Sequence, residues 1–280
     1  MVSSRADKYD ERTARGRGRG KRWLLHRSRK DGMTEADRSN CGISEAVQGL
    51  WIGRELSVME QLSIRSFLMN GHEYHLYVYD DVKLVPAGTI LKDASEILPA
   101  SMIFQYRNRK SYAGFANFFR YKLLLERGGW WADSDLICHR RFDFQQEYVF
   151  ATEKWHDYEV ITCGAIKAPA GSEVMAYAWH VCRNKNPDEL TWGETGSRLL
   201  IEAVEKFSLG EYVKPHQVFC PLPNWEWNDV LNPDLELRFD GVTHAIHLWN
   251  EKWRQAGQDK NQAYHEDCLY ERLKRRFLVS

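Results

Sequence analysis

Residues 111–138 read SYAGFANFFRYKLLLERGGWWADSDLIC, and the order of apolar and polar side chains in this stretch decides the fold. Apolar residues recur at helical spacing over 113–127, and two glycines then end the helix. Residues 130–132 form a short apolar strand that delivers Asp133 and Asp135 to its carboxyl end, where open α/β sheets bind ligands. The stretch therefore predicts a metal-dependent site at the end of a strand.

The segments before this stretch predict a pair of parallel strands. Residues 46–52 are a short apolar run typical of a buried strand, and residues 55–70 carry a helical apolar face that ends at Asn70-Gly71. Residues 74–79 alternate aromatic and aliphatic side chains as a second strand. Strand, helix and strand in this order indicate parallel strands in one sheet. Residues 86–99 are expected to be a connector with a short helical piece.

The segments after it predict further elements of the same domain. Strands are expected at 148–151, 160–167 and 243–249, helices at 172–182, 197–207 and 267–277, and an aromatic loop at 221–227. At 280 residues the chain is long enough to bury a substantial core. We therefore expect residues 41–280 to form a single α/β domain whose mixed, mostly parallel sheet is flanked by helices.

Charge is uneven along a chain whose formal net charge is zero. Residues 1–30 contain eleven of the 39 basic residues and three of the 39 acidic residues. The rest of the chain therefore has 28 basic and 36 acidic residues. Residues 1–40 are expected to be disordered, because the Arg-Gly repeat at 15–20 has no apolar periodicity. This basic segment is an arm that binds nucleic acid or an anionic membrane, a solvated tail, or an over-extended start ahead of Met33.

The sequence lacks the usual signals of secretion and of membrane insertion. No stretch approaches the ~18 to 20 apolar residues that span a bilayer, and the six cysteines show neither a CxxC pair nor the spacing of a zinc site. We expect a cytoplasmic protein with reduced thiols, which contacts an anionic membrane peripherally if at all. Nucleic acid is not its expected partner.

The tripeptide Asp133-Ser134-Asp135 suggests metal chemistry. It offers two hard oxygen ligands close together, the environment in which Mg²⁺ or Mn²⁺ holds a diphosphate. A metal in this place would neutralise a leaving nucleoside diphosphate, which is Lewis-acid catalysis of group transfer. Taken alone, the same tripeptide is also typical of a solvated turn after a strand.

The wider context resembles a known family of enzymes. The run A-N-x-x-R-Y-x-x-L-x-x-x-G-G-x-x-A-D-S-D is similar to the sugar-binding region of DXD glycosyltransferases, which include yeast-type initiating mannosyltransferases, α-1,4-galactosyl- and N-acetylglucosaminyltransferases and glucosylating toxin domains. Gly49–Gly53 resembles the opening strand of that family, and Ala245–Asn250 its closing H-x-W segment. The resemblance spans about residues 44–255 and implies a GT-A-like nucleotide-diphospho-sugar transferase fold.

Residue by residue, the resemblance implies a donor site. Leu50, Trp51 and Gly53 would line the nucleotide base and ribose. Asn117 and Arg120 are three residues apart on one helix face, and they would contact the hydroxyls or phosphate of the donor. The implied reaction moves a sugar from a UDP- or GDP-sugar to a glycan or lipid-linked acceptor, as in polysaccharide biosynthesis, with retention of configuration.

The resemblance also implies how Mn²⁺ or Mg²⁺ is held. Asp135 would be a direct ligand, and Asp133 would share contacts to the metal, the ribose or the donor sugar. His247, or Asn250 beside it, would be the third protein ligand, since one strand end seldom completes a coordination shell. The other interpretation of His247 is an ordinary buried histidine next to Trp249.

The segment TWGETG at 191–196 is similar to a T-G-P block of the family. Glu194 would there be an acceptor-site carboxylate, while the equally open interpretation is a capped helix entry ahead of Leu199-Leu200. The eleven tryptophans could stack on sugars, although a core role is favoured for any single one. The candidate catalytic residues are Asp133, Asp135, Arg120 and Glu194.

Two positions depart from the family pattern. Asn117 stands where the family has an Asp that receives donor hydroxyls, and Cys163-Gly164 replaces Asn-Ala or Asn-Gly. The donor sugar therefore cannot be copied from the family. Two alternatives of other classes stay open: a nucleic-acid-binding protein that uses its Arg/Gly-rich N-terminus, and another metal-dependent nucleotide-diphosphate enzyme such as a nucleotidyltransferase or sugar-nucleotide hydrolase.

Overall fold

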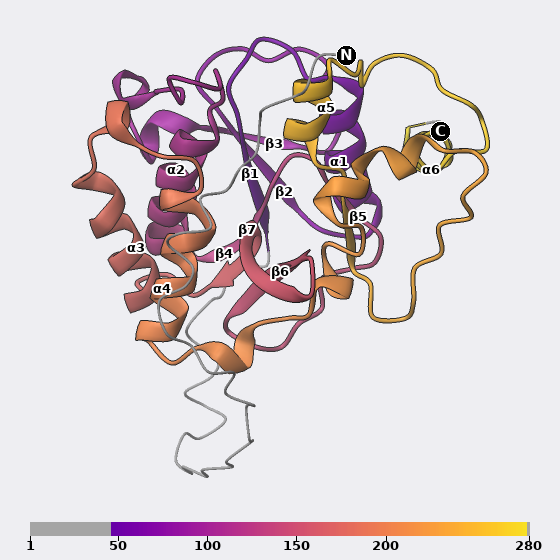
Figure 1. The fold of residues 1–280 in the computed structure, drawn as a ribbon. Coiled ribbons are helices and arrows are strands. Elements are labelled where there is room, and N and C mark those ends of the chain that lie inside the picture. The colour runs from indigo at the N-terminus through magenta and orange to yellow at the C-terminus, as the bar shows by residue number, and fades with distance from the viewer. Residues whose placement is uncertain (1–45, 279–280) are drawn as a thin grey trace, which may run out of the picture. The chain divides into compact units, whose positions relative to one another are not determined.

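A six-stranded sheet and a two-stranded sheet carry the fold in the computed structural model, which describes residues 46–278 (Figure 1). In chain order the elements are β1 (Val47–Trp51), α1 (Val58–Met69), β2 (Tyr74–Val78), β3 (Ile90–Asp93), α2 (Ala113–Arg127), β4 (Gly129–Ala132), β5 (Leu136–Cys138), β6 (Val149–Trp155), β7 (Tyr158–Ala168), α3 (Glu173–Arg183), α4 (Leu199–Lys206), β8 (Ala245–His247), α5 (Asn250–Ala256) and α6 (Leu269–Phe277). The described residues all belong to one unit. The basic segment 1–40 lies outside them, so its predicted disorder and binding roles stay predictions.

The larger sheet is mixed and mostly parallel. Its strand order is β3-β2-β1-β4-β7-β6. The pairs among β1, β2, β3 and β4 are parallel, while β7 runs antiparallel to both β4 and β6. The predicted pair of parallel strands is confirmed, with Val47 beside Tyr74 and Trp51 beside Val78. The predicted α/β architecture is confirmed as well.

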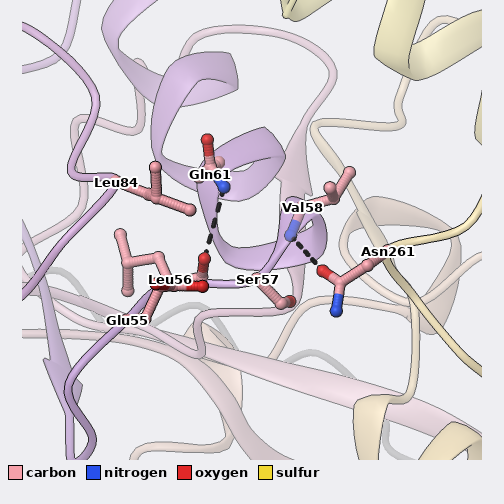
Figure 2. A pocket seen from close by; sticks show the side chains of 7 residues that line it. All are labelled: Glu55, Leu56, Ser57, Val58, Gln61, Leu84 and Asn261. Atoms are coloured by element: carbon pink, nitrogen blue, oxygen red, sulfur yellow. Dashed lines mark hydrogen bonds between the residues drawn. The ribbon is translucent and has the colours of Figure 1, made fainter.

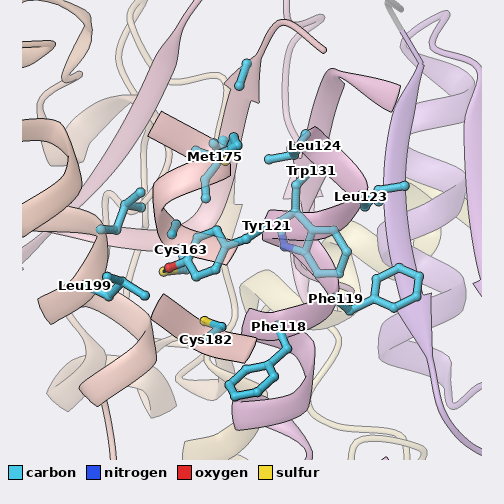
Figure 3. Packing of buried hydrophobic residues seen from close by; sticks show 14 of the residues in the cluster. Phe118, Phe119, Tyr121, Leu123, Leu124, Trp131, Cys163, Met175, Cys182 and Leu199 are labelled. Carbon is cyan, nitrogen blue, oxygen red and sulfur yellow. The ribbon is translucent and has the colours of Figure 1, made fainter. Parts of the chain in front are cut away.

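Helices cover both sides of this sheet. α2, α3 and α4 lie on one side, and α1 and α6 lie on the other with the β5–β8 pair (Figure 1). On the first side, Phe118 and Tyr121 of α2 pack with Trp131 of β4 and Cys163 of β7 (Figure 3). Burial of such aromatic side chains is the main stabilising term in a core of this kind.

The connection from α2 to β4 determines where the site lies. α2 covers the predicted range 113–127, and Gly128 follows with φ 63°, in the left-handed region that glycine adopts without strain. A Cβ atom on Gly128 would lie 2.5 Å from the backbone nitrogen of Ala170, so a larger residue would force the backbone apart. The chain therefore turns sharply and enters β4 two residues before Trp131.

Three short elements differ from the sequence prediction. β3 lies inside the predicted connector 86–99, and its exposed Ile90 and Leu91 gave no burial pattern to detect. β5 and α5 were not predicted, because three and seven residues are too few to show a period. A 3₁₀ segment at Asn224–Leu231 overlaps the predicted aromatic loop.

No helix among residues 46–278 has the length and apolar character needed to cross a bilayer.

Candidate functional site

The end of β4 presents two carboxylates, as predicted. All four residues of β4 are buried, and the chain leaves the sheet at Asp133. The backbone N–H of Asp133 donates to the carbonyl of Gly164 on β7 at 2.8 Å, and the Leu136 N–H donates to the Asp133 carbonyl at 3.0 Å. This tight turn holds Asp133 and Asp135 beside each other between the two sheets.

His247 reaches this turn through the smaller sheet. Leu136 of β5 pairs with His247 of β8, and the Leu248 N–H donates to the carbonyl of Asp135 at 3.0 Å. The imidazole Nε2 lies 3.2 Å from Oδ1 of Asp135. One ligand atom from each of Asp133, Asp135 and His247 lies within 4.8 Å of the others. The structure thus brings together three of the four predicted metal ligands.

Asp135 is buried and strongly held. Besides His247, the backbone N–H of Asn250 donates to its Oδ2 at 2.7 Å. Burial opposes ionisation, but the charge and hydrogen bond of His247 and the Asn250 N–H outweigh it, so the pKa of Asp135 lies below its usual value. Burial likewise opposes a charge on His247, and the Asp135 carboxylate more than compensates, so the pKa of His247 is raised well above its usual value.

Asp133 lies in a different electrostatic setting. Its Oδ1 accepts from Trp131 Nε1 at 2.8 Å and lies 3.2 Å from the guanidinium of Arg120. Burial raises the pKa of Asp133, the Arg120 charge only partly offsets this, and Asp135 adds to the rise. The side chain is 28% exposed, so it is the more accessible of the two carboxylates.

Arg120 and Asn117 share the inner face of α2, as predicted. Arg120 is 4% exposed, its guanidinium lies over the Trp131 ring at 4.8 Å, and it also donates to the carbonyl of Cys163. Asn117 donates to Thr195 Oγ1 at 3.4 Å. The Arg120 Nε also donates to the Ala116 carbonyl at 3.2 Å. A buried guanidinium that contacts one carboxylate and two carbonyls is fixed in place, so Arg120 orients Asp133 rather than moving freely.

The three predicted nucleotide-binding residues lie at the carboxyl end of β1. Leu50 packs against the core on the α2 side. The indole Nε1 of Trp51 is buried and has no hydrogen-bond partner among the described residues, and it lies 3.2 Å from the place of a Cβ on Gly53. The ammonium of Lys260 sits 5.7 Å from the centre of the Trp51 ring. A buried N–H without a partner is a position at which a ligand acceptor atom would be favourable.

Two predicted side chains are engaged elsewhere. Asn250 Oδ1 accepts from Lys260 Nζ at 3.0 Å, so only its backbone touches the carboxylate cluster. Glu194 pairs with Lys185 at 2.8 Å and accepts the backbone N–H of Thr191 at 3.0 Å. Glu194 thereby holds its own loop closed. α4 begins at Leu199, as the alternative of a helix entry predicted, but no Ser or Thr side chain caps it. Their predicted roles in metal binding and catalysis stay predictions.

Two residues near the site carried no signal in the sequence. Lys260 lies in the loop between α5 and α6 and bonds to both Asn250 and the buried Glu60. Burial raises the pKa of Glu153 on β6, and the nearby charge of His247 only partly offsets this. Neither belongs to a motif or a periodic pattern, so only the tertiary structure reveals them.

A cleft of about 480 Å³ opens at the start of α1, near Lys260. Figure 2 shows that Gln61 donates to the Leu56 carbonyl and that the Val58 N–H donates to Asn261 Oδ1 across this cleft. The cleft is lined by Glu55, Leu56, Ser57, Val58, Gln61, Leu84 and Asn261. None of these is a predicted site residue, so the cleft and the carboxylate cluster are separate features.

Comparison with solved structures finds glycosyltransferases at low similarity. PaToxG glycosyltransferase is 15% identical with a TM-score of 0.45, and the match covers 60% of this chain and 70% of that one. The glycosyltransferase GlyE of Streptococcus pneumoniae TIGR4 is 12% identical with a TM-score of 0.38, covering 73% of this chain and 55% of GlyE, so the match spans about half of that protein. TM-scores this low carry no argument about function. No curated protein matches the sequence.

Comparison with protein families gives a match over the central part of the chain. The model of the glycosyltransferase sugar-binding region containing a DXD motif matches residues 57–158. That range includes α1, α2, β4 and the Asp133-Ser134-Asp135 turn, together with Arg120. The matched DXD motif is thus the carboxylate pair that the fold places beside His247. Residues 57–158 are therefore similar to the sugar-binding region of the DXD glycosyltransferases.

Proposed function

We propose that this protein is a metal-dependent glycosyltransferase that moves a sugar from a UDP- or GDP-sugar to a glycan or lipid-linked acceptor. The observation that carries the proposal is the approach of Asp133, Asp135 and His247 to within 4.8 Å at the end of β4. Ligands of α/β sheets bind at this edge, and carboxylates there suit a cation bound to a diphosphate.

The side chains of this cluster fit a divalent transition metal. Two carboxylates and one imidazole suit Mn²⁺, which accepts nitrogen ligands, better than Mg²⁺, which favours an all-oxygen shell. Asp133, Asp135 and His247 would hold the ion. When bound, it would supply Lewis-acid neutralisation of the diphosphate that leaves with the nucleotide.

The remaining predicted residues would position the donor. The Oδ1 atom of Asp133 makes both contacts with the side chains of Trp131 and Arg120. Its Oδ2 atom lies 3.7 Å from the point where a Cβ atom on Gly164 would be, so glycine at this position leaves room for a ligand. Arg120 fixes the orientation of the Asp133 carboxylate. The unpaired Nε1 of Trp51 would donate to the nucleotide at the end of β1. Positioning of this kind lowers the entropic part of the barrier.

Retention of configuration and formation of an α-glycosidic bond form part of the proposal and are supported by the family resemblance. We assign no side chain as a nucleophile. The reaction as proposed releases a nucleoside diphosphate while the acceptor grows by one sugar. A nucleotidyltransferase or a sugar-nucleotide hydrolase would give different products.

The test is turnover of UDP- and GDP-sugars with Mn²⁺, read out as released nucleoside diphosphate and as extended acceptor. An Asp135→Asn protein is expected to lose at least about 100-fold in turnover, since a ligand to the ion is removed. Glu211→Gln changes an exposed carboxylate that is not part of the cluster and serves as the matched control. Full metal-dependent turnover by Asp135→Asn, or wild-type transfer that persists in EDTA, would overturn the proposal.

A further inference from the structure

The hairpin of β6 and β7 has an unusual tip. Trp155 pairs with Tyr158, and only His156 and Asp157 connect the two strands (Figure 1). His156 has φ 53°, a left-handed conformation that residues other than glycine seldom adopt. Two-residue hairpin loops ordinarily require a positive φ at their first residue, so the turn itself accounts for the backbone of His156. The ring of His156 lies against Trp225.

Trp225 comes from a distant part of the chain, the 3₁₀ segment Asn224–Leu231. Its ring stacks on His156 with 5.3 Å between ring centres and 12° between planes. Trp225 is 40% exposed and Tyr158 is 57% exposed. We call Trp155, His156, Tyr158 and Trp225 the hairpin surface. Large aromatic side chains gathered on a surface commonly mark a binding site.

The segment that leads to Trp225 connects the hairpin surface with the carboxylate cluster. Glu153 and Trp155 are two residues apart on β6, so their side chains point to the same face. Trp249 Nε1 donates to the Leu222 carbonyl at 3.0 Å, and the Trp249 ring centre lies 3.9 Å from that of His247, so the segment that leads to Trp225 lies beside the cluster. A ligand that rests on the hairpin surface would therefore extend past Glu153 toward the proposed donor sugar.

We propose that the hairpin surface, with Glu153 at its base, is the acceptor subsite and that it binds a carbohydrate. This inference rests on the proposed function. A sugar ring has one face of C–H groups, which packs on an aromatic ring, and a rim of hydroxyls, which donate to a carboxylate. Trp225 and Tyr158 supply the rings, and Glu153 supplies the acceptor of hydroxyl hydrogen bonds.

Saturation-transfer NMR with maltose, cellobiose and lactose tests sugar binding without any donor. The wild type is expected to show contacts to at least one of these sugars. Trp225→Ala and Tyr158→Ala should each weaken binding about tenfold, since loss of one stacked ring corresponds to about 1.4 kcal/mol. Glu153→Gln should weaken binding as well while keeping the side-chain shape. Val242→Ala, which removes an exposed apolar side chain outside the surface, is the control and should bind as the wild type does.

The second readout is the ratio of sugar transfer to donor hydrolysis. Trp225→Ala should lower this ratio about tenfold relative to Val242→Ala at limiting acceptor, because the acceptor is held less tightly. Failure of the wild type to turn over any nucleotide sugar would count against the proposed function, yet the NMR experiment would still report on the hairpin surface. Absence of sugar binding by the wild type, or equal binding by wild type and Trp225→Ala, would overturn this inference.

Discussion

Asp133 and Asp135 are two residues apart, yet their surroundings suit them to different tasks. Asp135 is buried, bonded to His247 and to the backbone of Asn250, and its pKa is lowered despite burial. Asp133 is partly exposed, bonded to Trp131 and Arg120, and its pKa is raised by burial. A carboxylate that stays ionised inside the protein suits permanent metal ligation, whereas the accessible one suits contact with a substrate.

His72 offers a prediction that is independent of the site. Burial, followed by the charge of Arg141, lowers the pKa of His72 from 6.5 to about 4, and its Nε2 accepts the Phe142 N–H at 2.9 Å. His72 binds a proton more tightly in the unfolded chain than in the folded protein. The free energy of unfolding therefore falls as pH drops from 6.5 toward 4. The loss should reach ~3 kcal/mol. Urea unfolding of wild type and His72→Gln at pH 7 and pH 4 measures it.

His72→Gln keeps an acceptor for the Phe142 N–H but cannot gain the proton. It should therefore lose less stability than the wild type between pH 7 and pH 4. His265→Gln replaces an exposed histidine and should behave as the wild type. An identical pH dependence for wild type and His72→Gln would contradict the prediction.

The sequence predicts the position of the two carboxylates in the fold, because a local pattern defines it. Asp133 and Asp135 follow an apolar run after a glycine stop, so their place at a strand end could be predicted. His247 lies 112 residues from Asp135, and only the family resemblance suggested their meeting. The side chains of Asn250 and Glu194 contact Lys260 and Lys185, which lie ten and nine residues away along the chain, a spacing that no local pattern specifies.

At the element scale, periodic segments could be predicted and short ones could not. α2 was predicted at its observed bounds because fifteen residues show a full apolar face and a glycine stop. β5 and β8 have three residues each and exist through their mutual pairing. Yet this pairing is what carries His247 to Asp135. The strand predicted at 243–249 contains β8, so only its partner β5 could not be predicted.

The loop between α5 and α6 is tied to α1 by a buried ion pair. Lys260 donates to Glu60, which is 0% exposed and also accepts the Ser57 N–H at 2.9 Å. Lys260→Met should destabilise the protein by about 2–3 kcal/mol, because the Glu60 carboxylate is left buried without its cation. Chemical denaturation measures the change in the free energy of unfolding.

A double variant separates this cause from simple loss of packing. Glu60→Met combined with Lys260→Met removes both charges and should recover part of the lost stability. Lys122→Met breaks a pair with Glu126 near the surface and should cost no more than about 0.5 kcal/mol. A double variant less stable than Lys260→Met alone would show that the buried charge is not the cause.

At the scale of the whole molecule, the cluster lies where the two sheets meet. Asp133 follows β4 of the large sheet, and its backbone bonds to β7. Asp135 precedes β5 of the small sheet, and His247 ends β8. An ion held by all three would link the two sheets and therefore the two sides of the fold. Metal binding should consequently be visible as global stability.

Mn²⁺ should raise the melting temperature, and more so at high pH. In the metal-free protein, burial lowers the pKa of His247, but the Asp135 carboxylate outweighs burial and raises this pKa. The pair of Asp135 and His247 therefore stabilises the fold fully below pH 6.5, and the stabilisation is lost as pH rises through the raised pKa. Mn²⁺ must displace the same proton, so its affinity rises with pH. At 100 times Kd the ion adds about 2.7 kcal/mol. Thermal unfolding at pH 6 and pH 8 should therefore show a larger Mn²⁺ shift at pH 8, while His247→Gln should show a smaller shift that is nearly independent of pH. Equal shifts for the wild type at both pH values would mean that His247 is not a ligand.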